Sequence, residues 1–345
     1  MNSVTPVKVF STSGSIELVQ DICGALRTRL PKEFQPDGYL KLSDSGFETF
    51  DNGCILPHIE NVRDHTVVII CTHAPRVHDG LFELFHLIDA IESADAKEII
   101  PVFPYFDYSR SDKKDQPHIS VLSRFIAEII NGHPVIKKKI ILDAHNDHVL
   151  QYFRPAANAI SAVLLLTDCL EREYLTSHLK TKSVVVFSDN GAADRYREVG
   201  HILNLPTAYI DKQRVSGITT PLGIVGNVEK MHCLLFDDEI LTGGTATRDA
   251  DMLFKYGASS VIFSAIHPIL SSKKIPNQEL VAKLESSSIE KFIITDSVPL
   301  GDKLAGVKKF KVISVANLLA EAIKRTILGE SLTQLYLPEN VPLYR

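Results

Sequence analysis

The chain has 345 residues, 45% of them hydrophobic, which suffices for about two domains with buried cores. Its formal net charge of −5 gives no reason to expect a nucleic-acid or membrane partner, and no apolar run approaches the ~18 residues of a membrane span. The five cysteines are scattered and the first residues lack a secretion-signal pattern, so we expect no disulfides or structural zinc and a cytoplasmic protein.

Short apolar runs alternate with longer amphipathic segments along the chain. The expected strands are, in chain order, Val7–Phe10, Val67–Cys71, Glu98–Phe103, Lys139–Leu142, Ser183–Phe187, Thr207–Ile210, His232–Phe236, Val261–Ser264, Lys291–Thr295 and Phe310–Ser314. Helical patterns cover Leu81–Ser93, Ser120–Ile130, Asp189–Leu203, the residues after Thr245, and Val315–Ile327. This alternation predicts an α/β architecture with mostly parallel sheets flanked by helices, and a domain boundary fits near residues 154–158.

The most informative segment runs from Met231 to Asp251. An expected strand is followed by two carboxylates, Asp237 and Asp238, and then by a Thr-Gly-Gly-Thr turn that opens a helix. Glycines let backbone N–H groups converge, the helix N-terminus adds partial positive charge, and threonine hydroxyls add donors, so the turn predicts a phosphate site. The carboxylates can accept hydrogen bonds from sugar hydroxyls. The segment therefore predicts a ribose 5-phosphate site; the alternative is an ordinary strand–turn–helix with exposed acids.

This segment resembles the phosphoribosyl-binding loop of the phosphoribosyltransferase fold, and the whole chain resembles the ribose-phosphate pyrophosphokinase (phosphoribosyl-diphosphate synthetase) family. The matching pieces occur in the same order: Phe50-Asp51-Asn52-Gly53, Glu60–Arg63, His78–Leu84 with Ile88-Asp89-Ala90, Pro104–Arg110, Asp143-Ala144-His145, Ser188–Gly191, Ile210–Arg214, the turn above, and Ile313–Ile323. The resemblance implies two phosphoribosyltransferase-like domains, residues 1–155 on the ATP side and residues 156–312 with the ribose-phosphate loop. Residues 313–345 would form a C-terminal helix and tail, and the chain would assemble as a dimer or hexamer.

The implied reaction is Mg²⁺-dependent. It moves the β,γ-diphosphate of ATP to the anomeric hydroxyl of ribose 5-phosphate and gives AMP and phosphoribosyl diphosphate, a precursor in nucleotide biosynthesis. Such a transfer depends on alignment, metal ions and positive charge. The resemblance gives the charge to Lys212 and Arg214, which precede Val215–Pro221, a segment that we expect to be a mobile loop acting as a lid. On composition alone, two solvated surface cations would be the simpler interpretation.

The resemblance implies roles for further side chains. His145 is a candidate for a metal or the β-phosphate, and Asp189 suits a helix N-cap as well as Mg²⁺. On the ATP side, Phe50 would stack on adenine near Asn52, Arg110 would form a fork to phosphates beside Asp112, and His78 and Asp79 would lie near the polyphosphate. The ribose-phosphate residues are Asp237, Asp238, Thr242, Gly243, Gly244 and Thr245.

The chain also departs from the family pattern. Asn52 and Cys54 stand where acids are usual, Ser111 and Asp194 replace other polar residues, and Leu241 replaces a third acid before the phosphate turn. Leu241 lowers the negative charge beside the acceptor, which would suit a larger acceptor. The alternative activity is therefore the same transfer onto ADP-ribose, in a phage-type pathway that rebuilds NAD. A plain phosphoribosyltransferase and a non-catalytic regulatory subunit are less favoured, because the full set of site residues is retained.

Overall fold

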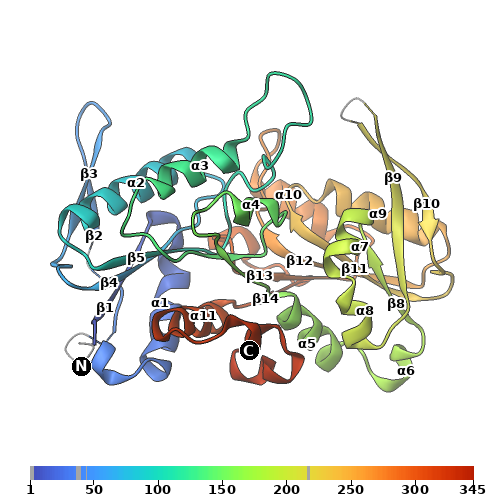
Figure 1. Ribbon diagram of the computed structural model, residues 1–345. Coiled ribbons are helices and arrows are strands. Elements are labelled where there is room, and N and C mark those ends of the chain that lie inside the picture. Colours follow the sequence, from blue (N-terminus) through green and yellow to red (C-terminus); the bar gives the residue numbers. More distant parts are fainter. Residues whose placement is uncertain (1–3, 36–39, 44, 216–217) are drawn as a thin grey trace. The chain divides into compact units, whose positions relative to one another are not determined.

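The computed structural model describes residues 4–35, 40–43, 45–215 and 218–345 (Figure 1). They form two compact units: unit 1 comprises Met1–Ser161, Ser297–Pro299 and Val315–Arg345, and unit 2 comprises Ala162–Asp296 and Leu300–Ser314. The sequence-based limits lay at residues 155/156 and 312/313, whereas the units change at 161/162. The C-terminal segment, predicted as a separate piece, belongs to unit 1. Within the described residues, no helix is both long and apolar enough to cross a membrane.

Unit 1 is built on a parallel sheet of five strands in the order β1-β4-β5-β6-β7. The strands are β1 (Val7–Ser11), β4 (Thr66–Ile70), β5 (Glu98–Phe103), β6 (Ile140–Leu142) and β7 (Asn158–Ile160). The helices are α1 (Ile16–Arg29), α2 (Val77–Ser93), α3 (Leu122–Asn131), α4 (His148–Gln151) and α11 (Ala316–Leu328). Strand β4 is buried along its whole length because α2 and α3 cover one face of the sheet and α1 and α11 the other (Figure 1).

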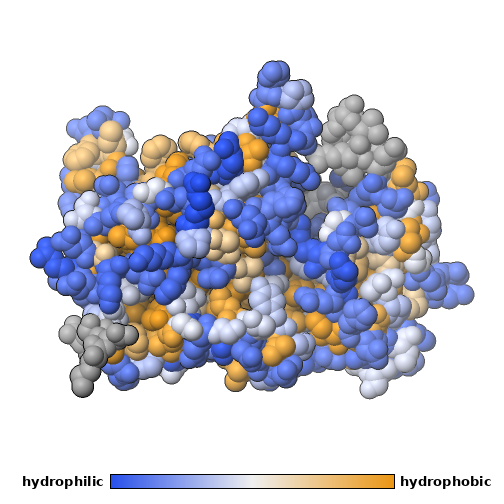
Figure 2. Space-filling view, viewed as in Figure 1, coloured by the Kyte–Doolittle hydropathy of each residue, from blue (hydrophilic) through white to orange (hydrophobic). Residues whose placement is uncertain are grey.

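A separate antiparallel hairpin, β2 (Ser45–Thr49) and β3 (Ile55–Ile59), contacts α2 in the same unit. Figure 2 shows hydrophobic residues gathered over β3 and α2, and several large apolar side chains of this region are exposed to solvent. The exposed ones include Phe50, Leu56 and Phe82. An apolar surface of this kind is typical of a binding face rather than of a solvated one.

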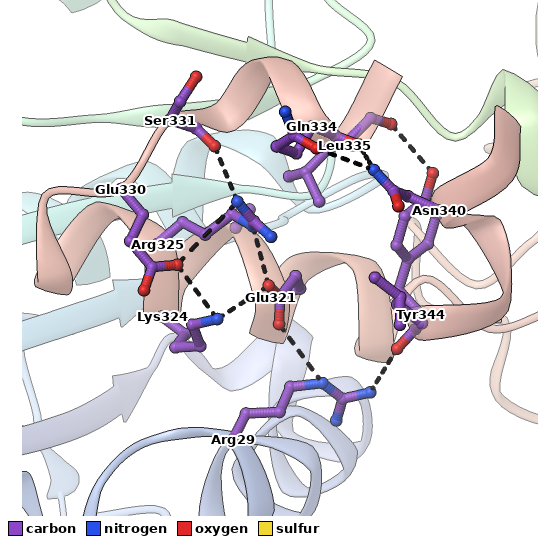
Figure 3. Close-up of polar contacts among 12 residues, drawn as sticks. Arg29, Glu321, Lys324, Arg325, Glu330, Ser331, Gln334, Leu335, Asn340 and Tyr344 are labelled. Atoms are coloured by element: carbon purple, nitrogen blue, oxygen red, sulfur yellow. Dashed lines mark hydrogen bonds and ion pairs between the residues drawn. The ribbon is translucent and has the colours of Figure 1, made fainter. Parts of the chain in front are cut away.

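The C-terminal segment is tied to unit 1 by a buried carboxylate. Glu321 of α11 is only 7% exposed and lies 2.8 Å from Arg325 Nε, 3.0 Å from Lys324 Nζ and 3.8 Å from Arg29 Nε of α1 (Figure 3). Arg29 Nη2 also donates to the carbonyl oxygen of Leu343. Three cations around one carboxylate offset the cost of burying it, which explains how α1, α11 and the last residues stay together.

Unit 2 contains a seven-stranded sheet in the order β10-β9-β8-β11-β12-β13-β14, parallel except for the antiparallel pair β9–β10. The strands are β8 (Ser183–Phe187), β9 (Thr207–Val215), β10 (Ile218–Val225), β11 (His232–Ile240), β12 (Ser260–Pro268), β13 (Lys291–Thr295) and β14 (Phe310–Ile313). The helices are α5 (Val163–Glu173), α6 (Ser177–Lys180), α7 (Asn190–Tyr196), α8 (Glu198–Leu203), α9 (Gly244–Lys255) and α10 (Asn277–Glu285). Helices α9 and α10 cover one face, and α5 and α8 the other (Figure 1).

The predicted α/β class is confirmed: each of the two units is built on a mostly parallel sheet flanked by helices. Two local expectations were wrong. The segment Val215–Pro221, expected as a loop, runs from the end of β9 into β10, and only residues 216–217 of it lie outside the described residues. The helical pattern over Asp189–Leu203 forms two helices, α7 and α8, which meet at Arg197.

Candidate functional site

The Thr-Gly-Gly-Thr turn of unit 2 joins β11 to α9. Gly243 adopts a left-handed conformation with φ of +72° as the N-cap of α9, and a Cβ atom there would lie 2.3 Å from Leu284 Cδ2. Both the dihedral angle and the close approach require glycine. Gly244 begins the helix without a positive φ, and its added Cβ would meet nothing closer than 3.5 Å. Position 243 at the helix start therefore requires glycine, whereas position 244 has room for a larger residue such as alanine.

The start of α9 presents hydrogen-bond donors, as a phosphate site requires. The first four N–H groups of any α-helix have no partner within the helix, and the helix dipole adds partial positive charge there. Thr242 Oγ1 accepts weakly from Gly244 N–H at 3.4 Å. Thr247, which the sequence analysis did not single out, donates its hydroxyl to the Gly243 carbonyl at 3.1 Å and so braces the turn. The predicted phosphate-binding role of the turn has the geometry that it needs.

The two acids lie inside β11 rather than after it. The neighbouring strand β8 pairs with β11 only as far as Phe187 opposite Phe236, whereas β12 continues alongside to Pro268 opposite Ile240. Asp237 and Asp238 thus begin where β8 has ended, at the carboxyl edge of a parallel sheet. Ligands of open α/β sheets bind at this edge.

Asp237 and Asp238 are not equivalent. Asp238 is buried and accepts from Arg195 Nη1 of α7 at 2.8 Å. Burial, and next the charge of Asp238, raise the pKa of Asp237 well above its usual value, and Asp189 adds a weaker push in the same direction. A carboxyl group that holds its proton more readily can donate as well as accept a hydrogen bond. Asp237 is therefore the better placed of the two for a sugar hydroxyl, since Asp238 already has a guanidinium partner.

Asp189 caps α7, as predicted. Its Oδ1 atom accepts from the backbone N–H of Ala192 at 2.8 Å, and the residue itself is extended, as an N-cap should be. The charge of Asp189 contributes to the raised pKa of Asp237, so the Asp189 carboxylate lies near the two acids of β11. Oxygen donors of this kind suit Mg²⁺, which is usually held by one or two carboxylates together with substrate phosphates.

Lys212 lies in β9 and forms a buried ion pair. Its Nζ atom is 2.8 Å from Asp249 Oδ2 of α9, and the side chains are 9% and 4% exposed. The sequence analysis did not include Asp249, which is separated from Lys212 by 37 residues. Arg214 follows two residues later in the same strand, and its side chain lies outside the described part of the structure.

The nucleotide candidates lie in unit 1, on three different segments. Phe50 and Asn52 are exposed in the turn between β2 and β3, where Asn52 Oδ1 accepts from the backbone N–H of Cys54. His78 and Asp79 lie in the first turn of α2, not in a loop before it. Arg110 is exposed in the loop after β5. The predicted roles of all these side chains, Asn52 included, stay proposals.

Two contacts and one buried carboxylate describe the surroundings of His78, Asp79 and Asp112. His78 Nδ1 lies 3.2 Å from the hydroxyl of Tyr108, a residue of the matching piece Pro104–Arg110 that received no role of its own. Asp79 Oδ2 accepts from Arg76 Nη2 at 3.2 Å on the exposed face of α2. Asp112 is buried, and its Oδ2 atom has no hydrogen-bond partner among the described residues; its predicted contact with the nucleotide stays a proposal. Tyr108 could have been found from its place between Phe106 and Arg110 in that segment.

A buried pair, His73 and Asp107, was missed. Their Nδ1 and Oδ2 atoms are 2.6 Å apart, and both side chains are almost completely buried. Burial raises the pKa of Asp107, and the hydrogen bond and charge of His73 oppose that rise. The pair joins the loop before α2 to the loop that carries Tyr108 and Arg110, so it holds together two of the ATP-side segments.

His145 and Asp189, the predicted metal ligands, belong to different units. His145 lies half-buried between β6 and α4 in unit 1, two residues after Asp143, which accepts from the hydroxyl of Ser161 at 2.6 Å. Over the described residues, no three His, Cys, Asp or Glu side chains form a ready-made metal site. The predicted Mg²⁺ ligands stay a proposal.

Comparison with known proteins identifies the family. A family model described as the N-terminal domain of ribose phosphate pyrophosphokinase matches residues 7–133, and one described as the phosphoribosyl synthetase-associated domain matches residues 185–337. Ribose-phosphate pyrophosphokinase 1 of Streptococcus pyogenes is 31% identical over 94% of this chain and 95% of its own length. Its counterpart in Listeria monocytogenes is 32% identical over 96% of this chain and 97% of its own.

A solved structure agrees with these relatives. The crystal structure of phosphoribosylpyrophosphate synthetase from Mycobacterium smegmatis superposes with a TM-score of 0.81 and 25% identity, covering 94% of this chain and 100% of the other. Matches to both halves, and to nearly the full length of the relatives, leave no large part of the chain unexplained. The chain is thus a transferase-type enzyme that belongs to the ribose-phosphate pyrophosphokinase family.

Proposed function

We propose that this enzyme transfers the β,γ-diphosphate of ATP to the anomeric hydroxyl of ribose 5-phosphate, with Mg²⁺, and releases AMP. The proposal rests on the turn between β11 and α9 of this chain, together with its membership of the family. Gly243 fixes the start of α9, and Asp237 lies shortly before it at the carboxyl edge of the sheet. This arrangement supports binding of a sugar that carries a phosphate and free hydroxyls.

The proposed chemistry divides among residues of the two units. In unit 2, the N–H groups at the start of α9 would hold the 5-phosphate, and Asp237 would bind the ribose hydroxyls. In unit 1, Phe50 would stack on adenine, while Arg110 and His78 would contact phosphates. The anomeric hydroxyl releases its proton to water as its oxygen bonds to the β-phosphorus. The bond from that phosphorus to the α,β-bridging oxygen breaks, so AMP leaves with that oxygen. Lys212 and Arg214 would stabilise the charge that builds up on the migrating oxygens.

We expect Mg²⁺ to neutralise the phosphate charges, with Asp189 of unit 2 and His145 of unit 1 as separate candidate ligands. The carboxylate of Asp189 suits such an ion, because Mg²⁺ is usually held by one or two carboxylates together with substrate phosphates. Chromatography of the nucleotides tests the proposal. Incubation with ATP, Mg²⁺ and ribose 5-phosphate should yield AMP, whereas ADP as the product would show a simple kinase.

A second acceptor, ADP-ribose, is supported by Leu241. This residue stands at the mouth of the phosphate turn and is 43% exposed, so it forms an open apolar wall where an acid would repel phosphate. An esterified 5-phosphate carries a single negative charge and needs such an open side. Comparison of kcat/KM for the two acceptors in wild type and Leu241→Asp tests this alternative. Loss of ADP-ribose turnover in the variant supports it, and absence of that turnover in wild type refutes it.

We also propose that the enzyme assembles as a dimer or hexamer, as the family resemblance implies. Phe82 of α2 and Phe125 of α3 support this, since they are 61% and 51% exposed and large exposed aromatic side chains are typical of interfaces. Light scattering with size-exclusion chromatography measures the mass directly. A mass equal to that of one chain at micromolar concentration would refute the assembly.

A further inference from the structure

The ion pair between Lys212 and Asp249 occupies a position where the fold otherwise buries apolar side chains. On β9, Ala208 and Ile210 belong to the hydrophobic core beneath α9. Side chains two residues apart on a strand share a face, so Lys212 continues this row toward the helix. The row brings a lysine, rather than a third apolar residue, into contact with α9.

Helix α9 shows the same departure from an apolar pattern. Ala246, Ala250 and Leu253 are buried in the same core, and Asp249, three residues after Ala246, is buried with them at 3% exposure. A carboxylate and an ammonium group are both costly at such positions, and a well-packed apolar pair would often be no less stable. Stability of the fold alone therefore does not explain why these two positions hold an ion pair instead of two apolar residues.

The location of the pair relates it to the phosphate turn. Asp249 lies five residues beyond Gly244, so it is about 7.5 Å along the helix axis from the start of α9. Its carboxylate holds Lys212 Nζ at 2.8 Å. The ammonium group is thus fixed beside the helix whose first turn takes the phosphate, and two of its three N–H donors can serve other acceptors.

We propose that Asp249 is a positioning residue for Lys212: it holds the ammonium group beside α9, ready for the migrating diphosphate. The proposal rests on the proposed function, in which Lys212 stabilises the transferred group. A free lysine side chain carries about 2 kcal/mol of rotamer entropy, which the ion pair removes before substrate binds. Loss of Asp249 should therefore lower kcat while leaving acceptor binding in place.

The charged surroundings of Asp249 add a pH dependence. Burial raises its pKa to about 6, although Lys212 and, less strongly, Arg248 lower it, and Asp189 raises it further. The carboxylate is mostly ionised at neutral pH and becomes protonated as the pH falls through about 6, which weakens its hold on Lys212. The logarithm of kcat should thus decline on the acid side with an apparent pKa near 6, and this decline should be absent in Asp249→Asn.

Steady-state kinetics of four variants test the proposal. Asp249→Asn should lower kcat at least 10-fold and change KM for ribose 5-phosphate less than 2-fold. Asp251→Asn is the matched control: it lies on the exposed side of the same helix and accepts only from the hydroxyl of Ser288 among the contacts described, so its kcat should stay within 2-fold. Lys212→Met should lower kcat more strongly than Asp249→Asn. Adding Asp249→Asn to Lys212→Met should then cause no further loss, because Asp249 acts through the lysine.

The outcomes separate this inference from the proposed function. If Lys212→Met is impaired while Asp249→Asn keeps full kcat, or if the two losses multiply in the double variant, the positioning role is wrong and the proposed function stands. If Lys212→Met is as active as wild type, the catalytic role of Lys212 fails, and the positioning role fails with it. Wild type needs no substitution for the pH test: a kcat that stays flat from pH 8 to pH 5 overturns the proposal even if Asp249→Asn does not fold.

Discussion

Replacement of Gly243 by alanine should both destabilise unit 2 and disable its phosphate turn. At φ of +72° a residue with a Cβ atom is strained, at a cost of about 1–2 kcal/mol. The added methyl group would also lie 2.3 Å from Leu284 Cδ2 and 3.1 Å from its Cδ1 and Cγ, so the whole end of that side chain must move. Overpacking of this kind costs about 1–3 kcal/mol. We expect a total loss of about 2–5 kcal/mol in the free energy of unfolding.

Gly244 provides the matched control, because it lies next in the same turn without a positive φ or a close neighbour. Gly244→Ala should be neutral or should stabilise by up to ~1 kcal/mol, as alanine suits a helix better than glycine. Urea denaturation of both variants measures the difference. In a double-mutant cycle, Leu284→Ala should recover the steric part of the Gly243→Ala loss, about 1–3 kcal/mol, and leave the backbone part.

Function should separate the two glycines as well. Gly243→Ala should raise KM for the acceptor at least 10-fold because the N–H groups at the start of α9 no longer converge, while KM for ATP changes little. Equal denaturation midpoints and equal acceptor KM values for the two variants would refute the role of Gly243 in shaping the turn.

Further consequences follow for charge and pH. Lys212→Ala and Arg214→Ala should each lower kcat on the order of 10²-fold with a small change in KM, and a near-normal kcat for either would remove it from the chemistry. Asp237→Asn should weaken acceptor use while calorimetry shows intact ATP affinity. Burial raises the pKa of Asp249 from its usual value of 3.8 to about 6, so between these values the folded chain keeps a proton that the unfolded chain releases. The free energy of unfolding should therefore fall by about 3 kcal/mol as the pH rises from about 4 to about 6, relative to Asp249→Asn, in urea denaturation at each pH. Glu321→Gln should cost about 1–3 kcal/mol of stability in urea, against less than about 0.5 kcal/mol for Glu279→Gln, whose exposed partner is Lys283.

The sequence was sufficient where one short run of residues determines the structure. Glu98–Phe103, Ser183–Phe187 and Lys291–Thr295 have the limits that were predicted, because strands buried on both faces are continuous apolar runs. The strand, turn and helix around Gly243 could be predicted for a similar reason, since the apolar run, glycines and threonines are adjacent in the chain; phosphate binding by the turn stays a prediction. Asp189 as an N-cap also follows from its immediate neighbours.

Local patterns failed where partners are distant. Strand β10 contains Pro221 and Gly223, which are typical of loops, and only its pairing with β9 makes it a strand. The pairs His73–Asp107 and Lys212–Asp249 join residues 34 and 37 positions apart, so no periodicity indicates them. The ion pair of Asp238 with Arg195 likewise depends on how α7 packs beside β11, and it distinguishes two acids that look alike in the sequence.

The central claim is that the anomeric oxygen of the acceptor attacks the β-phosphorus of ATP. Ribose 5-phosphate labelled with ¹⁸O at the anomeric hydroxyl tests it directly, with ³¹P NMR of the products after reaction with ATP and Mg²⁺. We expect AMP without label and an equal amount of sugar diphosphate whose ¹⁸O bridges carbon and phosphorus, seen as an isotope shift of that phosphorus signal. Label in AMP, or ADP as the nucleotide product, would contradict it.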